Sequence, residues 1–142
     1  MGIKELFDLS GRVALVTGGS RGLGLQMAEA LGEMGAKVAI TARKAKELGD
    51  AETHLRQRGI EVLTHACDLS DPTAPKPLVD TVMAQWGRID ILVNNAGTTW
   101  GAPMEDHPLD AWQKIIALNL TPMFLLTQAV GKAAMIPRRA GR

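Results

Sequence analysis

The sequence predicts an α/β fold, a doubly wound parallel sheet of four strands in the order 3-2-1-4 with helices on both faces. Short apolar runs alternate four times with segments of helical periodicity, and such alternation is typical of parallel strands joined by right-handed crossovers. The pattern repeats about every 25 to 30 residues, the size of one strand–helix–strand unit. No linker or low-complexity segment divides the chain, so residues 1–142 are expected to form one domain.

Two apolar runs rich in valine and alanine predict the first two strands, at residues 12–18 and 36–43. Runs of this kind are buried on both faces of a parallel sheet. Apolar residues recur at helical spacing over residues 22–34 and predict the first helix, and the polar segment 44–59 predicts the second. Gly59 suits the left-handed conformation that often ends a helix.

The third unit is a predicted strand over residues 60–68 followed by a helix over residues 70–87. Side chains that accept a hydrogen bond from the first helical N–H groups favour a helix start, and proline is well placed in the first turn. We therefore expect Ser70 or Asp71 to cap this helix, with Pro72 in its first turn.

The fourth unit is a strand over residues 89–97, an irregular segment over 98–107 and a long helix from about Pro108 to Ala134. Pro122 lies inside this helix and cannot donate an N–H to the carbonyl of Leu118. The sequence therefore predicts a kink there.

Composition and charge exclude several classes of partner. The chain has 16 Lys plus Arg and 15 Asp plus Glu, spread along its length, so no basic surface for nucleic acid is expected. The single cysteine, Cys67, excludes an internal disulfide, and together with the absence of a signal peptide it indicates the cytoplasm. No run reaches the ~18 apolar residues of a membrane helix. The histidines lack partners at ligand spacing, so no metal site is expected.

A glycine-rich turn, TGGSRGLG at residues 17–24, joins the first strand to the first helix. Its glycines allow close approach of the backbone, and the free N–H groups of the helix can receive an anion, most often a pyrophosphate. The spacing of Gly18, Gly22 and Gly24 differs from the common G-x-G-x-x-G fingerprint. A plain structural turn is the alternative.

A second motif, NNAG at residues 94–97, ends the fourth strand. Asn and Gly also form ordinary turns. In an open parallel sheet, however, ligands bind beyond the carboxyl ends of the strands, where the strand order reverses. With the order 3-2-1-4, the first and fourth strands are neighbours, and both motifs are expected to face one crevice.

Together, T-G-x-x-x-G-x-G and N-N-A-G resemble the short-chain dehydrogenase/reductase family, over residues 9–142. The resemblance implies a Rossmann-type fold and hydride transfer between a nicotinamide nucleotide and a small-molecule alcohol or carbonyl. It implies that the pyrophosphate and ribose lie along the glycine-rich turn, the adenine after the third strand, and the other riboses at the second motif. The residues so implied are Gly18, Ser20, Arg21, Gly22, Leu23 and Gly24, then Asp68 and Leu69, then Asn95, Ala96 and Gly97. For Asp68, capping of the next turn stays an alternative.

The charge at the end of the second strand favours NADP(H) over NAD(H). NAD sites place an acid there to bind the ribose 2′-hydroxyl, whereas a 2′-phosphate needs cations. This sequence has Thr41, Ala42 and Arg43 at that point, with Arg21 near by in the glycine-rich turn. Guanidinium groups bind phosphate in a bidentate manner. The alternative is that Arg43 is only a solvated start of the helix.

Asn119 lies inside the long helix, where asparagine is usually a surface residue or a local hydrogen-bonding group. The resemblance implies instead that Asn119 belongs to the catalytic set, with its backbone carbonyl holding a water of the proton relay.

The chain contains no tyrosine, whereas the resemblance implies a catalytic tyrosine, a lysine four residues later and a serine, all beyond a fifth strand. We therefore expect an incomplete domain that lacks the catalytic half and is inactive alone. The fourth strand is expected to have an unpaired edge, which favours association of copies, and the segment 137–142 is expected to lead toward a fifth strand. A non-catalytic nucleotide-binding module and an inert fragment are the alternatives. The substrate resemblance is to gluconate 5-dehydrogenases, although 3-oxoacyl reductases share most of these features.

Overall fold

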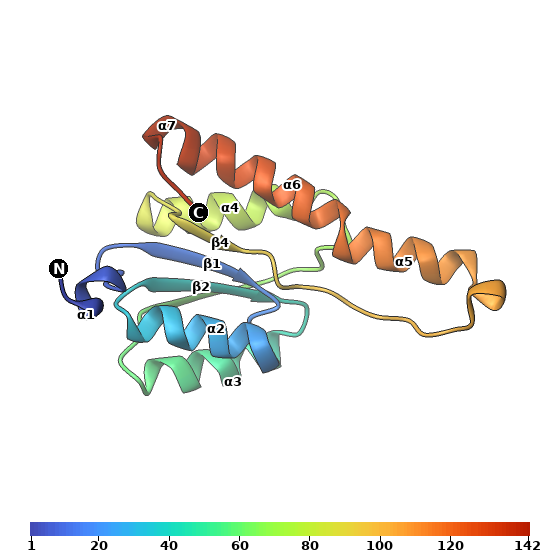
Figure 1. Cartoon of the computed structure of the whole chain (residues 1–142), viewed down its shortest axis with the longest axis horizontal. Coiled ribbons are helices and arrows are strands. Elements are labelled where there is room, and N and C mark those ends of the chain that lie inside the picture. Colours follow the sequence, from blue (N-terminus) through green and yellow to red (C-terminus); the bar gives the residue numbers. More distant parts are fainter.

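Four parallel strands form one sheet in the order β3-β2-β1-β4 in the computed structural model, which describes residues 1–142 (Figure 1). This order confirms the predicted topology. The strands are β1 (Val13–Thr17), β2 (Lys37–Ala42), β3 (Val62–Ala66) and β4 (Ile91–Val93). Thr17 lies opposite Thr41, and Val16 lies opposite Val93, so β1, β2 and β4 end side by side.

Helices cover both faces of the sheet, and the alternation of side chains along each strand divides the core in two. Val13 and Leu15 of β1 pack toward one face, in a cluster with apolar residues of the helices α4 (Pro75–Trp86) and α6 (Thr121–Val130). Val16 packs toward the other face, against α2 (Gly22–Glu33) and α3 (Ala45–Arg56). Figure 1 shows the two helical layers on opposite sides of the sheet.

The start of α4 differs from the prediction, because the helix begins at Pro75 and not at Ser70. The Asp71 carboxylate accepts hydrogen bonds from the N–H (2.8 Å) and hydroxyl (2.7 Å) of Thr73. Asp71 thus closes a turn before the helix and does not cap it. A short helix, α1 (Ile3–Leu6), was also not predicted.

The predicted long helix is interrupted at Leu120, close to Pro122. It consists of α5 (Leu109–Asn119), α6, a π-helical segment η2 (Gly131–Met135) and α7 (Ile136–Arg138), and a 3₁₀ turn η1 (Met104–Asp106) precedes it. The backbone departs from α-helical geometry at Leu120 (φ −114°, ψ −55°), two residues before the proline. The predicted kink is confirmed.

The helical run Leu109–Arg138 is long and apolar enough to cross a membrane by length and composition alone. The sequence did not predict this, because polar residues such as Lys114 and Asn119 interrupt its apolar stretches. The mostly buried core helix of a soluble protein passes the same test, whereas only 17% of the apolar window is buried here. Here α6 buries Leu126 and Val130 in the cluster shared with α4.

The outer edge of β4 is partly paired, contrary to the expectation of a free edge. The N–H of Arg142 donates to the carbonyl of Asp90 (2.9 Å), and its own carbonyl accepts from the N–H of Leu92 (2.9 Å). These two bonds are the pattern of a parallel ladder, so Arg142 lies along β4 as a strand residue would.

Candidate functional site

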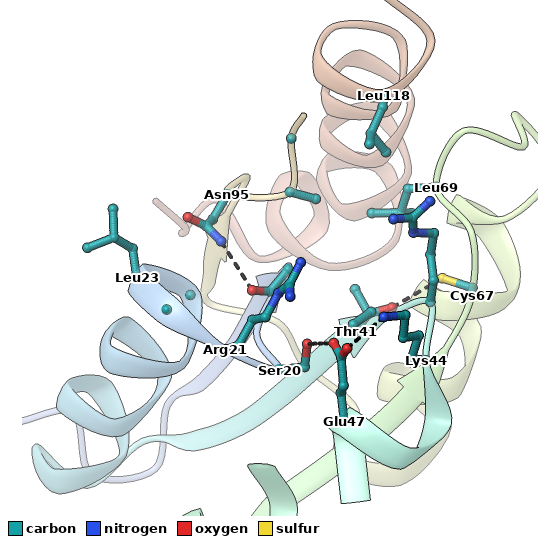
Figure 2. Close-up of a pocket in the computed structure, with 17 residues that line it drawn as sticks. Ser20, Arg21, Leu23, Thr41, Lys44, Glu47, Cys67, Leu69, Asn95 and Leu118 are labelled. Atoms are coloured by element: carbon teal, nitrogen blue, oxygen red, sulfur yellow. Dashed lines mark hydrogen bonds and ion pairs between the residues drawn. The ribbon is translucent and has the colours of Figure 1, made fainter. Parts of the chain in front are cut away.

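A crevice of about 370 Å³ opens at the carboxyl ends of the strands (Figure 2). It is walled by the β1–α2 turn, the end of β2 with the start of α3, the segment after β3, and the segment after β4. All the residues nominated from sequence except Asp68 and Asn119 line it, and these are Gly18, Ser20, Arg21, Gly22, Leu23, Gly24, Arg43, Leu69, Asn95, Ala96 and Gly97.

The β1–α2 turn depends on its glycines. Gly18 (φ +63°) and Gly22 (φ +55°) adopt left-handed conformations, and a Cβ atom on Gly24 would collide with the carbonyl of Gly18. Glycine therefore lets the first turn of α2 lie directly against the end of β1. No side chain caps this helix, so its first N–H groups face the crevice as donors for an anion.

Thr17 joins the glycine-rich turn to the NNAG motif. Its hydroxyl oxygen accepts hydrogen bonds from the N–H groups of Asn95 and Ala96, both at 2.9 Å, and donates to the carbonyl of Val93 (3.3 Å). The Asn95 side-chain amide donates in return to the carbonyl of Thr17 (3.0 Å). The two motifs that were predicted to share a crevice are thus hydrogen-bonded to each other.

Charged side chains gather on the side of the crevice formed by β2 and α3. The Glu47 carboxylate lies 3.0 Å from Nζ of Lys44 and 3.5 Å from the Ser20 hydroxyl (Figure 2). The hydrogen bond from Lys44 lowers the pKa of Glu47, with smaller contributions from the charges of Lys44 and Arg21. Sequence reasoning missed Lys44 and Glu47 as crevice residues, because charges at the start of a polar helix look like a solvated face. The available signal was their place in the first turn after β2.

Cys67 also lines the crevice, and its Sγ lies 3.1 Å from the Thr41 hydroxyl oxygen. Burial raises the pKa of the Cys67 thiol above its ordinary value. At neutral pH it is therefore a neutral polar group and not a nucleophile.

Asp68 does not line the crevice. It is exposed, and its carboxylate accepts hydrogen bonds from the N–H (2.9 Å) and hydroxyl (2.7 Å) of Ser70, which lower the pKa of Asp68. Asp68 thus closes the turn after β3, as the alternative interpretation expected, and its contact with adenine stays a prediction. Its neighbours Cys67 and Leu69 line the crevice instead (Figure 2).

Asn119 also lies outside the main crevice, beside a small hollow lined by Thr17, Leu69, Ala96 and Pro122 among others. Its side-chain amide donates to the carbonyl of Thr98 (2.8 Å) and accepts from the N–H of Thr98 (2.7 Å). Asn119 therefore holds the segment after NNAG against the end of α5, a contact that sequence reasoning did not anticipate. The role implied for its backbone carbonyl stays a prediction.

A family model described as short chain dehydrogenase matches residues 12–142. The chain belongs to the short-chain dehydrogenase family. One curated relative is a rhamnolipid-biosynthesis 3-oxoacyl-(acyl-carrier-protein) reductase of Pseudomonas aeruginosa, to which this short-chain dehydrogenase chain is 44% identical over 122 residues. The match covers 86% of this chain and 47% of the reductase. The chain is 41% identical over 139 residues to a 2-dehydro-3-deoxy-D-gluconate 5-dehydrogenase of Pseudoalteromonas atlantica, covering 97% and 54%. The chain thus spans about half the length of these relatives.

Two solved structures are also similar to the chain. A metagenomic short-chain oxidoreductase in complex with NADP matches with a TM-score of 0.89 and 43% identity, over 94% of this chain and 61% of that one. An NAD⁺-bound xylitol dehydrogenase matches with a TM-score of 0.90 and 35% identity, over 94% and 52%. One of these neighbours of the same fold thus binds NADP and the other binds NAD⁺.

Proposed function

We propose that this chain forms the NADP(H)-binding part of a short-chain oxidoreductase that interconverts a small-molecule alcohol and a carbonyl by hydride transfer. The observation that carries the proposal is the crevice at the carboxyl ends of β1, β2 and β4, which combines an uncapped helix N-terminus with three cations. These cations are Arg21, Arg43 and Lys44. Such a site suits a nucleotide with negative charge at both the pyrophosphate and the ribose.

The residues present fit such a nucleotide. The first turn of α2 offers backbone N–H donors that no side chain caps, as pyrophosphate binding requires. Leu69 gives an apolar wall for the adenine ring, and Asn95, Ala96 and Gly97 border the opposite side. When bound, the nicotinamide supplies the hydride acceptor or donor. The protein's own contribution in this half is to bind and orient it.

We further propose that these 142 residues bind the nucleotide without turnover. The sequence holds no tyrosine, so the phenol that the family uses for proton transfer is not among them. We also propose that the protein acts in the cytoplasm and associates with further copies of itself. The exposed apolar side chains on α5 and α6 support this association, among them Leu109, Trp112 and Phe124. A non-catalytic nucleotide-binding module shares the same binding site and differs only in the absence of any associated chemistry.

Titration of the chain with NADPH and NADH, followed by nicotinamide fluorescence, tests the proposal. We expect saturable binding with NADPH the tighter ligand. Replacement of Arg43 by Asp removes one charge-assisted contact, each of which contributes about 1.5–3 kcal/mol, so NADPH affinity should fall roughly ten- to a hundredfold and the preference should reverse.

Lys46→Asp is the matched control for this experiment, because Lys46 lies three residues after Arg43 in the first turn of α3, with a side chain that is 90% exposed and paired with Asp50. It makes the same change of charge outside the crevice and should shift affinity by less than about threefold, as expected for an exposed charge. An unchanged NADPH-to-NADH ratio in Arg43→Asp contradicts the preference, and the absence of saturable binding of either nucleotide contradicts the proposed function.

A further inference from the structure

We infer that Glu47 limits the preference of the crevice for a ribose 2′-phosphate. Its carboxylate is hydrogen-bonded to the Lys44 ammonium group and the Ser20 hydroxyl, the two groups that the phosphate would use. This inference rests on the proposed function, namely that the crevice binds the adenosine end of a nicotinamide nucleotide. It adds a residue that determines specificity and that lies outside both sequence motifs.

Glu47 is the only acidic residue that lines the crevice. It lies in the first turn of α3, and its side chain is 31% exposed. Figure 2 shows the carboxylate pointing toward the crevice, between the Ser20 hydroxyl and the Lys44 ammonium group. The site thus presents three cations, Arg21, Arg43 and Lys44, against one carboxylate.

The hydrogen bonds of Glu47 determine which groups of the crevice are available to a ligand. The Glu47 carboxylate lies 3.0 Å from Nζ of Lys44 and 3.5 Å from the Ser20 hydroxyl oxygen. Both groups would otherwise be free to bind a 2′-phosphate. Lys44 and Arg21 also lower the pKa of Glu47, so it is ionised at neutral pH. A dianionic phosphate placed there would be repelled by this charge and would compete with it for Lys44.

A ribose 2′-hydroxyl would meet the opposite situation. It can donate a hydrogen bond to a carboxylate, as the acid of an NAD site accepts one. The sequence offered no acid at the end of β2, but the fold brings one to the same place from the first turn of α3. Glu47 is therefore expected to weaken binding of the 2′-phosphate and to support binding of the 2′-hydroxyl, so that the preference reflects a balance with Arg21 and Arg43.

The test compares two ligands that differ only in the 2′-phosphate, adenosine 2′,5′-bisphosphate and 5′-AMP, by calorimetric titration of the 142-residue chain. In Glu47→Gln we expect the bisphosphate to bind roughly three- to tenfold tighter, the effect of removing one partly screened like charge. Binding of 5′-AMP should stay the same or weaken by up to about tenfold, since the 2′-hydroxyl exchanges a hydrogen bond to an ionised carboxylate for a weaker one to a neutral amide.

Asp50→Asn is the matched control, because Asp50 is on the same helix with a side chain that is 73% exposed and paired with Lys46. It should leave both affinities within about twofold. A second variant, Lys44→Gln, should weaken the bisphosphate roughly three- to tenfold and leave 5′-AMP unchanged, which keeps the test decisive if Glu47→Gln does not fold.

The outcomes separate the inference from the proposed function. Wild-type binding of both ligands, with a ratio of affinities that Glu47→Gln leaves unchanged, overturns the role of Glu47 and leaves the nucleotide site standing. If Glu47→Gln does not fold, an unchanged ratio in Lys44→Gln has the same consequence. Failure of the wild-type chain to bind either ligand, NADPH or NADH overturns both.

Discussion

Thr17 illustrates how much a single side chain contributes to this site. It is 2% exposed, and its hydroxyl uses its full hydrogen-bonding capacity, since it accepts from two N–H groups and donates to one carbonyl. A hydroxyl has one donor and two lone pairs. The end of β1 is therefore matched to the backbone of Asn95 and Ala96, which no aliphatic residue of the same shape would achieve.

Replacement of Thr17 by Val should destabilise the chain by about 1–3 kcal/mol, because the partly buried N–H of Ala96 loses its acceptor. The N–H of Asn95 loses one of two acceptors and keeps the carbonyl of Val93 (3.1 Å). Thr17→Ser keeps the hydroxyl and should cost less than about 1.5 kcal/mol, the range of a single lost methyl group. Urea unfolding at neutral pH measures the difference. Equal stability of the Val and Ser variants would show that the hydroxyl does not hold the two motifs together.

At the level of residues, the sequence predicted the motif side chains well and the charged ones poorly. Glycines, Asn95 and Ala96 have few alternatives in such turns, so their place in the crevice followed from their type and spacing. Glu47 and Asp68 are both exposed or half-buried acids, and only the geometry decides that one faces the crevice while the other bonds Ser70. Side-chain direction at a helix start is a tertiary property.

The two helices beside the crevice use glycine in opposite ways. Gly24 in α2 faces the backbone of Gly18, where no side chain fits. Gly49 lies in the middle of α3, where it is exposed and where an added methyl group would have no neighbouring atom within 4 Å. In the first case glycine is required by packing, and in the second it only lowers helix propensity.

Gly24→Ala and Gly49→Ala should therefore have opposite effects. The first forces α2 away from β1 and should destabilise by about 1–3 kcal/mol, the usual cost of overpacking, with loss of nucleotide affinity because the helix N-terminus moves. The second should stabilise by up to about 1 kcal/mol and leave affinity unchanged. Thermal unfolding and NADPH titration of the two variants check this, and a neutral Gly24→Ala would contradict the close approach.

At the level of elements, the sequence predicted every strand and the four major helical segments, because periodicity and apolar runs are local signals. The break before Pro122 was predictable since the missing N–H belongs to the residue itself. The late start of α4 and the pairing of Arg142 with β4 were not. They depend on which of several local hydrogen-bond partners, or which distant edge, a backbone group finds in the folded chain.

In the molecule as a whole, Asp90 connects parts that are far apart in sequence. Its side chain is 5% exposed and accepts hydrogen bonds from Arg88 (2.7 and 2.8 Å), Arg138 (3.0 Å) and the N–H of Val13 (2.9 Å). The start of β4, the start of β1 and the end of the last helix thus meet at one carboxylate. A buried charge with this many partners is costly to disrupt, because removal of one partner leaves the others unpaired.

The pKa of Asp90 makes this connection sensitive to acid. Burial alone raises that pKa, but the hydrogen bonds from Arg88, Val13 and Arg138 outweigh burial and hold it far below its ordinary value. Because the folded pKa is below the unfolded value of about 3.9, the carboxylate stabilises the fold above about pH 4. That stabilisation is lost progressively as the pH falls from about 4 toward the folded pKa.

Asp90→Asn should destabilise the chain by about 3–5 kcal/mol at pH 7, the typical cost of breaking a buried ion pair on one side. The deficit should shrink as the pH falls from 5 to 2, because the wild-type protein loses the same contribution while the variant does not. Urea unfolding along this pH series measures the difference in unfolding free energy between the two proteins, so the contributions of the other acidic residues cancel.

Asp80→Asn is the control, since its carboxylate is 59% exposed beside Lys76 and should contribute less than about 1 kcal/mol. Parallel pH curves for wild type and Asp90→Asn would mean that the arginines stabilise this corner through packing of their side chains and not through the charge of Asp90.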